Sequence, residues 1–382
     1  MKTGLLRHIA HGINLSVCAV MFCASAGAAE AVPALREVYK SKFDIGVAAG
    51  ALPGNYQPEE LALLRRHFGV VTPENDMKLN HVQRHEGGFS FEKPDAFVAF
   101  AGANHLKIVG HNLFWMRDDE TPAWFFKDGG KPASRELLLR RMREHARAVA
   151  GRYRGKIACW DVANEALSDG DEFLRPSKWQ SLAGDDVVEQ AFHFAHEADP
   201  QAKLVYNDYS IESPEKRPKL LRLLREFKAR GAPIHVVGIQ GHWELDCVPF
   251  GDIEETIEAV SKLGVKVAIT ELDLGVVRRG RWWADDGKHR EELRKLDPYA
   301  GGCPTDVLRR QAEQYARLFR LLLKHADAVD RVTFWGLHDG RSWLDDWPWK
   351  RSDHGLIFDR QFQPKPAFFA IAAEASRGHP PK

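Results

Sequence analysis

Short apolar runs recur along the chain at regular intervals, with polar segments between them. There are eight such runs: residues 43–50, 70–75, 108–115, 157–165, 203–208, 236–242, 266–273 and 331–337. They are continuous stretches of Val, Ile, Leu and aromatic residues rather than alternations of apolar and polar positions. This pattern predicts β-strands that are covered on both faces, as in a parallel sheet.

Segments with helical periodicity lie between the apolar runs. They are residues 57–68, 94–105, 134–153, 185–198, 214–229, 252–263, 305–325 and 366–373. In the first segment Leu61, Leu64 and Phe68 share one face. Eight strands that alternate with eight helices predict an α/β fold, a single (β/α)8 TIM barrel.

The chain contains no linker rich in Pro, Gly or Ser, so we expect one barrel domain over residues 30–382. One loop is longer than a usual βα loop, because Gly275 to Pro304 separates the seventh strand from its helix by roughly 30 residues. It contains Trp282 and Trp283. Loops that follow barrel strands lie on the functional face, so we expect this enlarged loop, at about 275–304, to border the cleft.

The first residues have the pattern of an export signal. A basic start with Lys2 and Arg7 is followed by an apolar stretch over residues 13–25 and by small residues at 26–28. This predicts a signal peptide over residues 1–29 and a mature protein that is periplasmic or secreted. No later apolar run approaches membrane-spanning length, so we expect no membrane partner.

Composition and charge exclude some classes of function. The chain has 382 residues, 44% of them hydrophobic, and a net charge of +1, with Lys and Arg spread along it. A nucleic-acid partner needs a concentrated basic face, so none is expected. Cys159, Cys247 and Cys303 lie beyond the signal, and an odd number argues against a disulfide framework. A bridge between Cys247 and Cys303 and three separate thiols both remain compatible with the sequence.

Polar side chains end nearly every predicted strand. From the second strand to the eighth they are Glu74, Asn75 and Lys78, then His111 and Trp115, Asn164 and Glu165, Asn207 and Asp208, Gln240 and His242, Glu271 and Asp273, and Trp335. Any one of them alone could simply bind a loop, but in a barrel all these ends meet at one face. Glu165 and Glu271 each end a buried run, and a pair of carboxyl groups is what glycoside hydrolysis requires.

The spacing of these residues adds a geometric expectation. Gln240 and His242 are two apart, as are Glu271 and Asp273, so each pair should project to the same side of its strand. By the same parity His111 and Trp115 should share a side. A His between two carboxylates can hold one of them ionised and oriented.

Motifs in a fixed order carry a resemblance to a known family. They are ENDMK at 74–78, GHNLFW at 110–115, WDVANE at 160–165, YNDY at 206–209, GIQGH at 238–242, TELD at 270–273, WGLHDGRSW at 335–343 and PKPA at 364–367. From about Phe43 to Ala370 the chain resembles the endo-β-1,4-xylanases of glycoside hydrolase family 10. One motif would be weak, but the ordered series is specific.

The resemblance implies the catalytic roles. Glu165 would be the acid/base and Glu271 the nucleophile that forms a covalent glycosyl-enzyme. Configuration would be retained, with the two carboxyl groups roughly 5–5.5 Å apart. We expect Glu165 to be protonated in the free enzyme, because the like charge of Glu271 raises its pKa until Glu271 is glycosylated.

The resemblance also implies supporting and substrate-binding residues. Asn164 would bind the sugar 2-hydroxyl, and His242, backed by Asp273, would position Glu271, with Gln240 beside them. The substrate-binding residues would be Glu74, Asn75 and Lys78 for the next sugar toward the non-reducing end, His111 for the sugar being cleaved, Trp115, Trp335 and Trp343 as stacking walls of the donor side, and Tyr209 on the acceptor side. Core packing is the alternative reading for each Trp.

The chain departs from the family pattern directly after Trp115. The family usually continues with His, a further residue and Gln, whereas here Met116, Arg117 and Asp118 follow. A thioether cannot donate a hydrogen bond, and a carboxylate replaces an amide. We therefore expect an atypical donor-subsite preference, with decorated xylan as one possible substrate.

The sequence disfavours three other functions. A retaining glycosidase of another barrel family acting on glucan is disfavoured by the motifs at 110–115 and 238–242. A barrel that binds polysaccharide without cleavage is disfavoured because both Glu residues are present. A metal enzyme is disfavoured because His111, His242, Glu271 and Asp273 lack the spacing of a metal motif. We expect no metal, no cofactor, xylan or xylo-oligosaccharides as the partner, and a monomer.

Overall fold

The computed structural model describes Met1 and residues 32–279, 295 and 297–377. Met1–Pro33 and Ala34–Lys382 form separate units, and the second is compact. The predicted signal peptide, and most of the enlarged loop at 275–304, therefore lie outside the described residues. Among the described helices none is both long enough and apolar enough to cross a membrane.

Strands and helices alternate through the compact unit. In chain order they are β1 Asp44–Ala48, α2 Pro58–His67, β2 Val70–Thr72, α4 Glu92–Ala103, β3 Lys107–Trp115, α5 Arg135–Val149, β6 Cys159–Asn164, α7 Val187–Ala198, β7 Lys203–Asp208, α8 Arg217–Arg230, β8 Val236–Ile239, α9 Phe250–Ser261, β10 Lys266–Gly275, α11 Thr305–Lys324, β11 Val329–Phe334 and α12 Pro366–Ser376. Each predicted strand and helix has a counterpart in this series.

Shorter elements lie at the ends and in the loops. They are α1 Leu35–Val38, α3 Leu79–Val82, η1 Ala123–Phe126, the hairpin β4 Lys127–Asp128 and β5 Lys131–Pro132, α6 Lys178–Ala183, β9 His242–Glu244, η2 Asp339–Arg341 and η3 Trp343–Asp345. Apart from His242, which belongs to the predicted strand 236–242, none of these was predicted, because elements of two to six residues carry too little periodicity to stand out.

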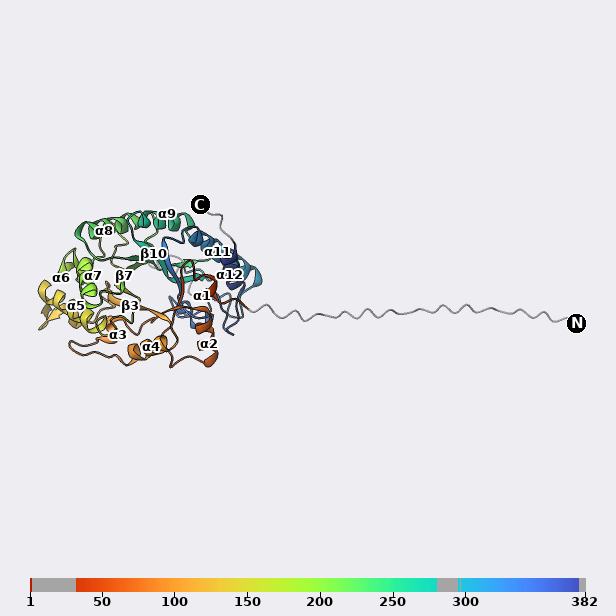
Figure 1. Ribbon diagram of the computed structural model, residues 1–382, viewed down its shortest axis with the longest axis horizontal. Coiled ribbons are helices and arrows are strands. Elements are labelled where there is room, and N and C mark those ends of the chain that lie inside the picture. Colours follow the sequence, from red (N-terminus) through yellow and green to blue (C-terminus); the bar gives the residue numbers. More distant parts are fainter. Residues whose placement is uncertain (2–31, 280–294, 296, 378–382) are drawn as a thin grey trace. The chain divides into compact units, whose positions relative to one another are not determined.

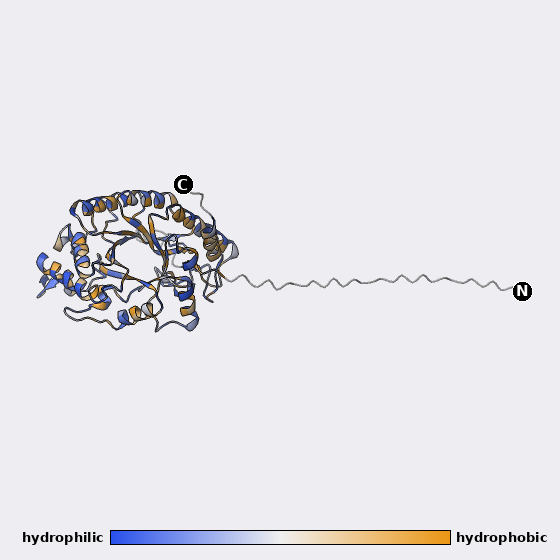
Figure 2. Ribbon diagram, viewed as in Figure 1, coloured by the Kyte–Doolittle hydropathy of each residue, from blue (hydrophilic) through white to orange (hydrophobic). Residues whose placement is uncertain are grey.

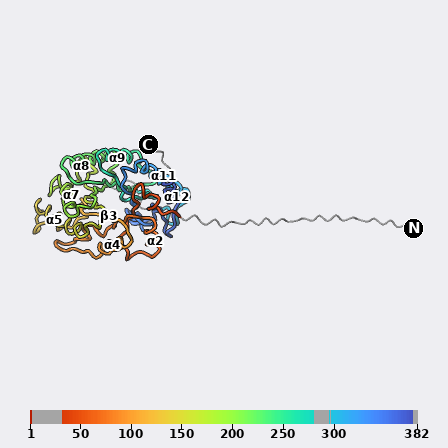
Figure 3. Tube along the Cα trace, viewed as in Figure 1, coloured from red at the N-terminus to blue at the C-terminus, as the bar shows by residue number. Residues whose placement is uncertain are grey.

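The strands close into a parallel barrel. Their order is β1, β2, β3, β6, β7, β8, β10 and β11, and β11 pairs in parallel with both β10 and β1. The helices surround the strands (Figure 1) and follow one another around the ring in chain order (Figure 3). This arrangement confirms the predicted (β/α)8 fold.

Apolar side chains from six strands pack together in the core, where the buried Arg331 also contacts Cys159. Val70, Val109, Cys159, Val205, Val236 and Ala268, one residue from each of six strands, form a buried cluster. Outside the strands, α8 and α9 show hydrophobic and hydrophilic bands in alternation (Figure 2). Such helices bury one face against the sheet and leave the other in water.

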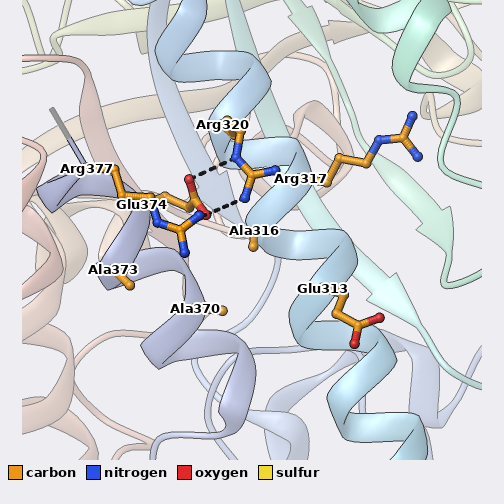
Figure 4. A pocket seen from close by; sticks show the side chains of 8 residues that line it. All are labelled: Glu313, Ala316, Arg317, Arg320, Ala370, Ala373, Glu374 and Arg377. Carbon is orange, nitrogen blue, oxygen red and sulfur yellow. Dashed lines mark hydrogen bonds and ion pairs between the residues drawn. The ribbon is translucent and has the colours of Figure 1, made fainter. Parts of the chain in front are cut away.

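The last helix closes the ring against its neighbour. Arg320 of α11 donates to the buried carboxylate of Glu374 on α12 at 2.7 and 3.2 Å, and Arg377 donates to the same carboxylate at 2.8 Å. Figure 4 shows this ion pair at the edge of a pocket between the two helices. The contact holds the C-terminal part of the chain against the barrel.

Three cysteines lie in the described part of the chain, and none of them forms a disulfide there. Cys159 is buried, Cys247 is exposed and Cys303 is partly exposed. Of the two arrangements left open by the sequence, the structure therefore has three separate thiols.

Candidate active site

Side chains from two other strands, β7 and β9, anchor Glu271. Its Oε1 accepts a hydrogen bond from Asn207 Nδ2 at 2.7 Å, and its Oε2 lies 3.1 Å from His242 Nε2. Only 6% of Glu271 is exposed. The carboxylate therefore has a fixed orientation at the C-terminal half of β10, with a donor on each oxygen.

His242 lies between two carboxylates, as the sequence predicted. Its Nδ1 is 2.8 Å from Asp273 Oδ2, opposite the contact with Glu271. Burial opposes protonation of this imidazole, but the charges and hydrogen bonds of Asp273 and Glu271 outweigh it and raise the pKa of His242 to about 9. A protonated imidazole donates from both nitrogens, so it can hold both carboxylates ionised.

The environment of Glu271 favours its charged form. Burial by itself would raise the pKa of this carboxyl group, but the hydrogen bond of His242 and the nearby charges of His111 and His242 lower it below the ordinary value. An ionised carboxylate at pH 7 is what a nucleophile requires.

Glu165 has the opposite environment. It is 6% exposed, and its Oε1 accepts a hydrogen bond from Gln240 Nε2 at 3.0 Å. Burial is the largest cause that raises the pKa of Glu165, and the charge of Asp208 comes next. The charge of Glu271 contributes less. The direction agrees with the expectation, but burial rather than repulsion by Glu271 is its main cause.

The backbone at Glu165 has a left-handed conformation, with φ of 58°. A non-glycine residue rarely adopts this conformation, and such strain is concentrated at functional sites. The Glu165 amide donates to Asn207 O at 2.9 Å, and the guanidinium of Arg175 donates from Nε to Glu165 O at 3.1 Å. These bonds fix the strained turn that directs the side chain into the site.

A chain of polar groups crosses three strands between the two Glu residues. Thr270 Oγ1 donates to Asn207 Oδ1 at 2.6 Å, and Asn207 Nδ2 donates to Asn164 Oδ1 at 2.8 Å. Because Asn164 accepts through its oxygen here, its amide nitrogen is the group left to donate to a ligand. This orientation suits the predicted contact with a sugar hydroxyl.

The predicted residues after β2 and on β3 lie near Glu271, and the charges of Glu74 and Lys78 interact with it. Lys78 Nζ donates to Asn75 Oδ1 at 2.8 Å and lies 4.5 Å from the ring centre of Trp115. Burial raises the pKa of Glu74, and the charges acting on it include those of Lys78, His111 and Glu271. These groups therefore belong to one electrostatic unit.

His111 is held by a partner that the sequence argument did not single out. Its Nδ1 lies 2.8 Å from Asp161 Oδ2 in the barrel interior. A register irregularity separates His111 from Phe114 in the pairing with β6. Side chains therefore do not alternate regularly between the two faces of β3 from His111 to Trp115. The expectation that these two residues share a side assumed an uninterrupted strand.

Trp335 and Trp343 enclose the imidazole of His242. The Trp335 ring centre is 5.2 Å from that of His111 and 6.2 Å from that of His242. The Trp343 ring centre is 4.7 Å from that of His242, and its Nε1 donates to Asp273 Oδ2 at 2.8 Å. Both rings therefore support the charged groups of the site, in addition to any contact with a sugar.

Tyr209 lies beyond Glu165 at the end of β7. Its hydroxyl accepts from Arg175 at 2.7 Å and donates to Asp169, and Lys216 Nζ lies 3.9 Å from its ring centre. Arg175 links this group to the backbone of Glu165. The structure thus brings Tyr209 to the rim beside Glu165 rather than beside Glu271.

Sequence reasoning missed several residues of this site. Asn207 was recognised as a strand end but was given no role, although it contacts Glu271. Asp161, Arg117 and Arg175 were not singled out for this site. The spacing of Asp161, three residues before Asn164 on the same buried run, gave no signal that distinguishes it from a core position.

Within the described residues, one group of side chains could hold a metal ion, and it lies on α9 and directly after α11. Glu254, Glu258 and His325 bring ligand atoms within 4.8 Å of one another. Lys324 also pairs with Glu254, at 2.6 Å. A bound ammonium group disfavours a cation there.

Comparisons with known proteins point to one family. The sequence model of Glycosyl hydrolase family 10 matches residues 34–374. The chain is 41% identical over 344 residues to an endo-1,4-beta-xylanase of Geobacillus stearothermophilus, covering 89% of this chain and 98% of the relative. It is 40% identical over 342 residues to a beta-1,4-xylanase of Dictyoglomus thermophilum, covering 89% and 90%.

Solved structures agree with these relatives. A GH10 endoxylanase retrieved from a sugarcane soil metagenome matches with a TM-score of 0.82 and 38% identity, covering 90% of this chain and 99% of the other. A xylanase of Paenibacillus barcinonensis in complex with a conduramine derivative matches with a TM-score of 0.81 and 37% identity, covering 90% and 99%.

Proposed function

The chain belongs to glycosyl hydrolase family 10, and we propose that it is an endo-1,4-β-xylanase that cleaves xylan by double displacement with retention of configuration. One observation carries the assignment of roles. Two buried carboxyl groups lie at the same end of the barrel, and their surroundings shift their pKa values in opposite directions, upward for Glu165 and downward for Glu271. Such divergence separates an acid from a nucleophile.

In the first step Glu271 attacks the anomeric carbon and Glu165 gives its proton to the departing glycosidic oxygen. His242 and Asn207 hold the attacking carboxylate in place, since each binds one of its oxygens. The products of this step are a covalent glycosyl-enzyme, a shortened xylan chain and an ionised Glu165.

In the second step Glu165 takes a proton from water, which attacks the anomeric carbon and releases Glu271. Ester formation removes the negative charge of Glu271 and with it one of the charges that raise the pKa of Glu165. The sign of this change favours the ionised form of Glu165 when a base is needed.

The remaining residues bind the substrate. Asn164 donates to the 2-hydroxyl of the cleaved sugar, a contact that strengthens in the transition state. His111 contacts the same sugar, and Glu74, Asn75 and Lys78 bind the next one toward the non-reducing end. Trp115, Trp335 and Trp343 border the donor side, and Tyr209 borders the acceptor side.

The donor subsites should differ from those of a relative with His and Gln after the β3 Trp. Met116 is buried and offers no donor. Asp118 accepts from the backbone of Lys178 at 2.8 Å, so its carboxylate is already engaged. We expect the ratio of kcat/KM for arabinose- or glucuronate-substituted over plain xylo-oligosaccharides to differ from that of such a relative. An identical ratio would refute this part of the proposal.

The site of action is outside the cytoplasm. The proposal rests on the basic, apolar and small-residue pattern of residues 1–29. N-terminal sequencing of protein recovered from the periplasm and the medium tests it. A mature chain that starts near Glu30 is expected, and an uncleaved cytoplasmic chain would contradict it.

Hydrolysis of xylohexaose tests the proposed activity. The wild type should cleave internal bonds and release products that are β-configured at first, whereas Glu271→Ala should leave the substrate intact. Release of xylose alone from one end, or α-configured first products, would refute the retaining endo mechanism.

A further inference from the structure

A guanidinium group approaches the carboxyl group of Glu165 from the loop after β3. Arg117 NH1 lies 3.9 Å from Glu165 Oε2, and 36% of the Arg117 side chain is exposed. Arg117 belongs to the segment in which this chain departs from the family pattern. The contact therefore joins the segment that departs from the family pattern to the proposed acid/base.

The position of Arg117 is fixed by a neighbouring carboxylate. Its Nε and NH2 donate to the two oxygens of Asp119 at 3.1 and 2.7 Å. This fork uses one edge of the planar guanidinium and leaves NH1 pointing at Glu165. Asp119 is 65% exposed, so it restrains Arg117 from the solvent side.

Charged groups from several strands and loops interact with Glu165. Asp208 from β7 and Glu271 from β10 are the anions that act on it. Lys78, after β2, also interacts with it but donates to Asn75. Arg175, after β6, binds the main-chain oxygen of Glu165 and the hydroxyl of Tyr209.

Arg117 therefore differs from the other cations around Glu165. Among the ion pairs between described residues, the one that reaches the Glu165 carboxylate comes from Arg117. Lys78 and Arg175 direct their hydrogen bonds to other groups. Two other side chains that act on the carboxylate, Gln240 and Trp115, are neutral.

We propose that Arg117 is a positioning residue that stabilises the ionised form of Glu165 through its charge and so sets the pH range of the acid/base. The inference rests on the proposed role of Glu165. When Glu165 releases its proton to the leaving oxygen, Arg117 stabilises the carboxylate that results. The same charge keeps Glu165 available as a base when it accepts a proton from water.

The sign of the effect gives the test. The alkaline limb of kcat/KM reports deprotonation of the acid in the free enzyme, and a cation beside a carboxyl group lowers its pKa. Arg117→Gln should move the alkaline limb for xylohexaose to higher pH by roughly 0.5–1 unit, as expected for one partly screened charge at this distance. Arg117→Lys keeps the charge and should leave the limb near its wild-type position.

Asp119→Asn should act in the opposite direction. It removes the anion that partly neutralises Arg117, so the limb should move to lower pH. A xylobioside with an activated phenolate leaving group needs little protonation, and with it Arg117→Gln should have little effect on kcat/KM. A purely structural role would lower the rate on both substrates without moving the limb.

Glu165→Gln separates this inference from the function on which it rests. If that variant keeps the alkaline limb, the role of Glu165 is wrong and the inference falls with it. If Glu165→Gln removes the limb but Arg117→Gln leaves it unmoved, the role of Glu165 stands and the inference about Arg117 is overturned.

Discussion

At the scale of single residues, the site is built on the contrast between two buried carboxyl groups at the same end of the barrel. Both are 6% exposed, so burial alone would favour the neutral acid in each. Glu271 escapes because His242 and Asn207 donate to its two oxygens. Glu165 interacts with the neutral side chains of Gln240 and Trp115 and has Asp208 nearby. The hydrogen-bond and charge partners of each carboxyl group, rather than how deeply it is buried, decide which group is the acid.

Asp273 should control the ionisation of Glu271 indirectly, because His242 lies between the two carboxylates. In Asp273→Asn the His242 imidazole loses its anionic partner, so its pKa falls from about 9 and its charge is weakened at neutral pH. At the acidic pH where Glu271 titrates, the imidazole still carries its proton, and the negative charge of Asp273 no longer offsets it. The pKa of Glu271 should therefore fall, and because the nucleophile must be ionised, the acid limb of kcat/KM should move to lower pH by about one unit.

Trp343→Phe is the matched control for this substitution. It removes the hydrogen bond to Asp273 but keeps the ring and the charge of Asp273. Its acid limb should stay close to that of the wild type. Measured on xylohexaose between pH 3 and 7, an acid limb in Asp273→Asn equal to that of the wild type would show that the charge of Asp273 does not act on Glu271 through His242.

The candidate residues could be predicted because their types are rare at the ends of buried runs. Glu165, Glu271 and His242 stood out in this way, and the predicted contact of His242 with both Glu271 and Asp273 is present. Asn207 and Asp161 did not stand out in the same way, since their partners lie 64 and 50 residues away in sequence. Contacts across the barrel depend on strand register, which a single sequence does not display.

At the scale of elements, a glycine turns the backbone so that residues of one segment reach partners on different strands. Gly241 has φ of 85° and lies between β8, which ends at Ile239, and β9, which begins at His242. The sequence predicted one strand through this point, with Gln240 and His242 on the same side. The turn at Gly241 instead sends Gln240 to Glu165 and His242 to Glu271. A single glycine thus lets one segment serve both carboxyl groups.

Strand ends differ from the prediction in other places too. β2 ends at Thr72 and β11 at Phe334, earlier than predicted, while β10 continues to Gly275. The residues beyond β2 and β11 turn into the site and leave the ladder. Apolar content predicted where strands run, but it could not separate ladder residues from the functional loops that follow them.

Gly238 on β8 leaves the space through which Asn207 reaches Glu271. A Cβ at this position would lie 2.4 Å from Asn207 Oδ1 and 2.7 Å from Thr270 Cγ2. Gly238→Ala should therefore displace Asn207, lower kcat/KM on xylohexaose by roughly tenfold to a hundredfold and reduce the free energy of unfolding by about 1–3 kcal/mol.

Gly251→Ala on α9 is the control, because no atom lies within 4 Å of its added Cβ. It should keep full activity and match or slightly exceed the wild type in stability, since Ala suits a helix better than Gly. Urea unfolding and kcat/KM are measured on both variants. If Gly238→Ala behaved like the control, Asn207 would not depend on this space.

At the scale of the whole molecule, barrel closure is what assembles the site. The groups that contact one another come from β3, β6, β7, β8, β9, β10 and the segment after β11, and these are adjacent around the ring. The alternation of strands and helices predicted this closure from sequence. The arrangement of the loops on the functional face was not predictable in the same way, since loops lack periodicity.

The central claim is that Glu271 becomes covalently attached to the sugar, and trapping that intermediate tests it most directly. The full mature enzyme is incubated with a 2-deoxy-2-fluoro-β-xylobioside carrying a dinitrophenolate leaving group, and its peptides are then examined by mass spectrometry. One fluoroxylobiosyl group on the peptide that contains Glu271, absent in Glu271→Ala, is the predicted result. A label on Glu165, or release of dinitrophenolate at the wild-type rate by Glu271→Ala, would contradict the account.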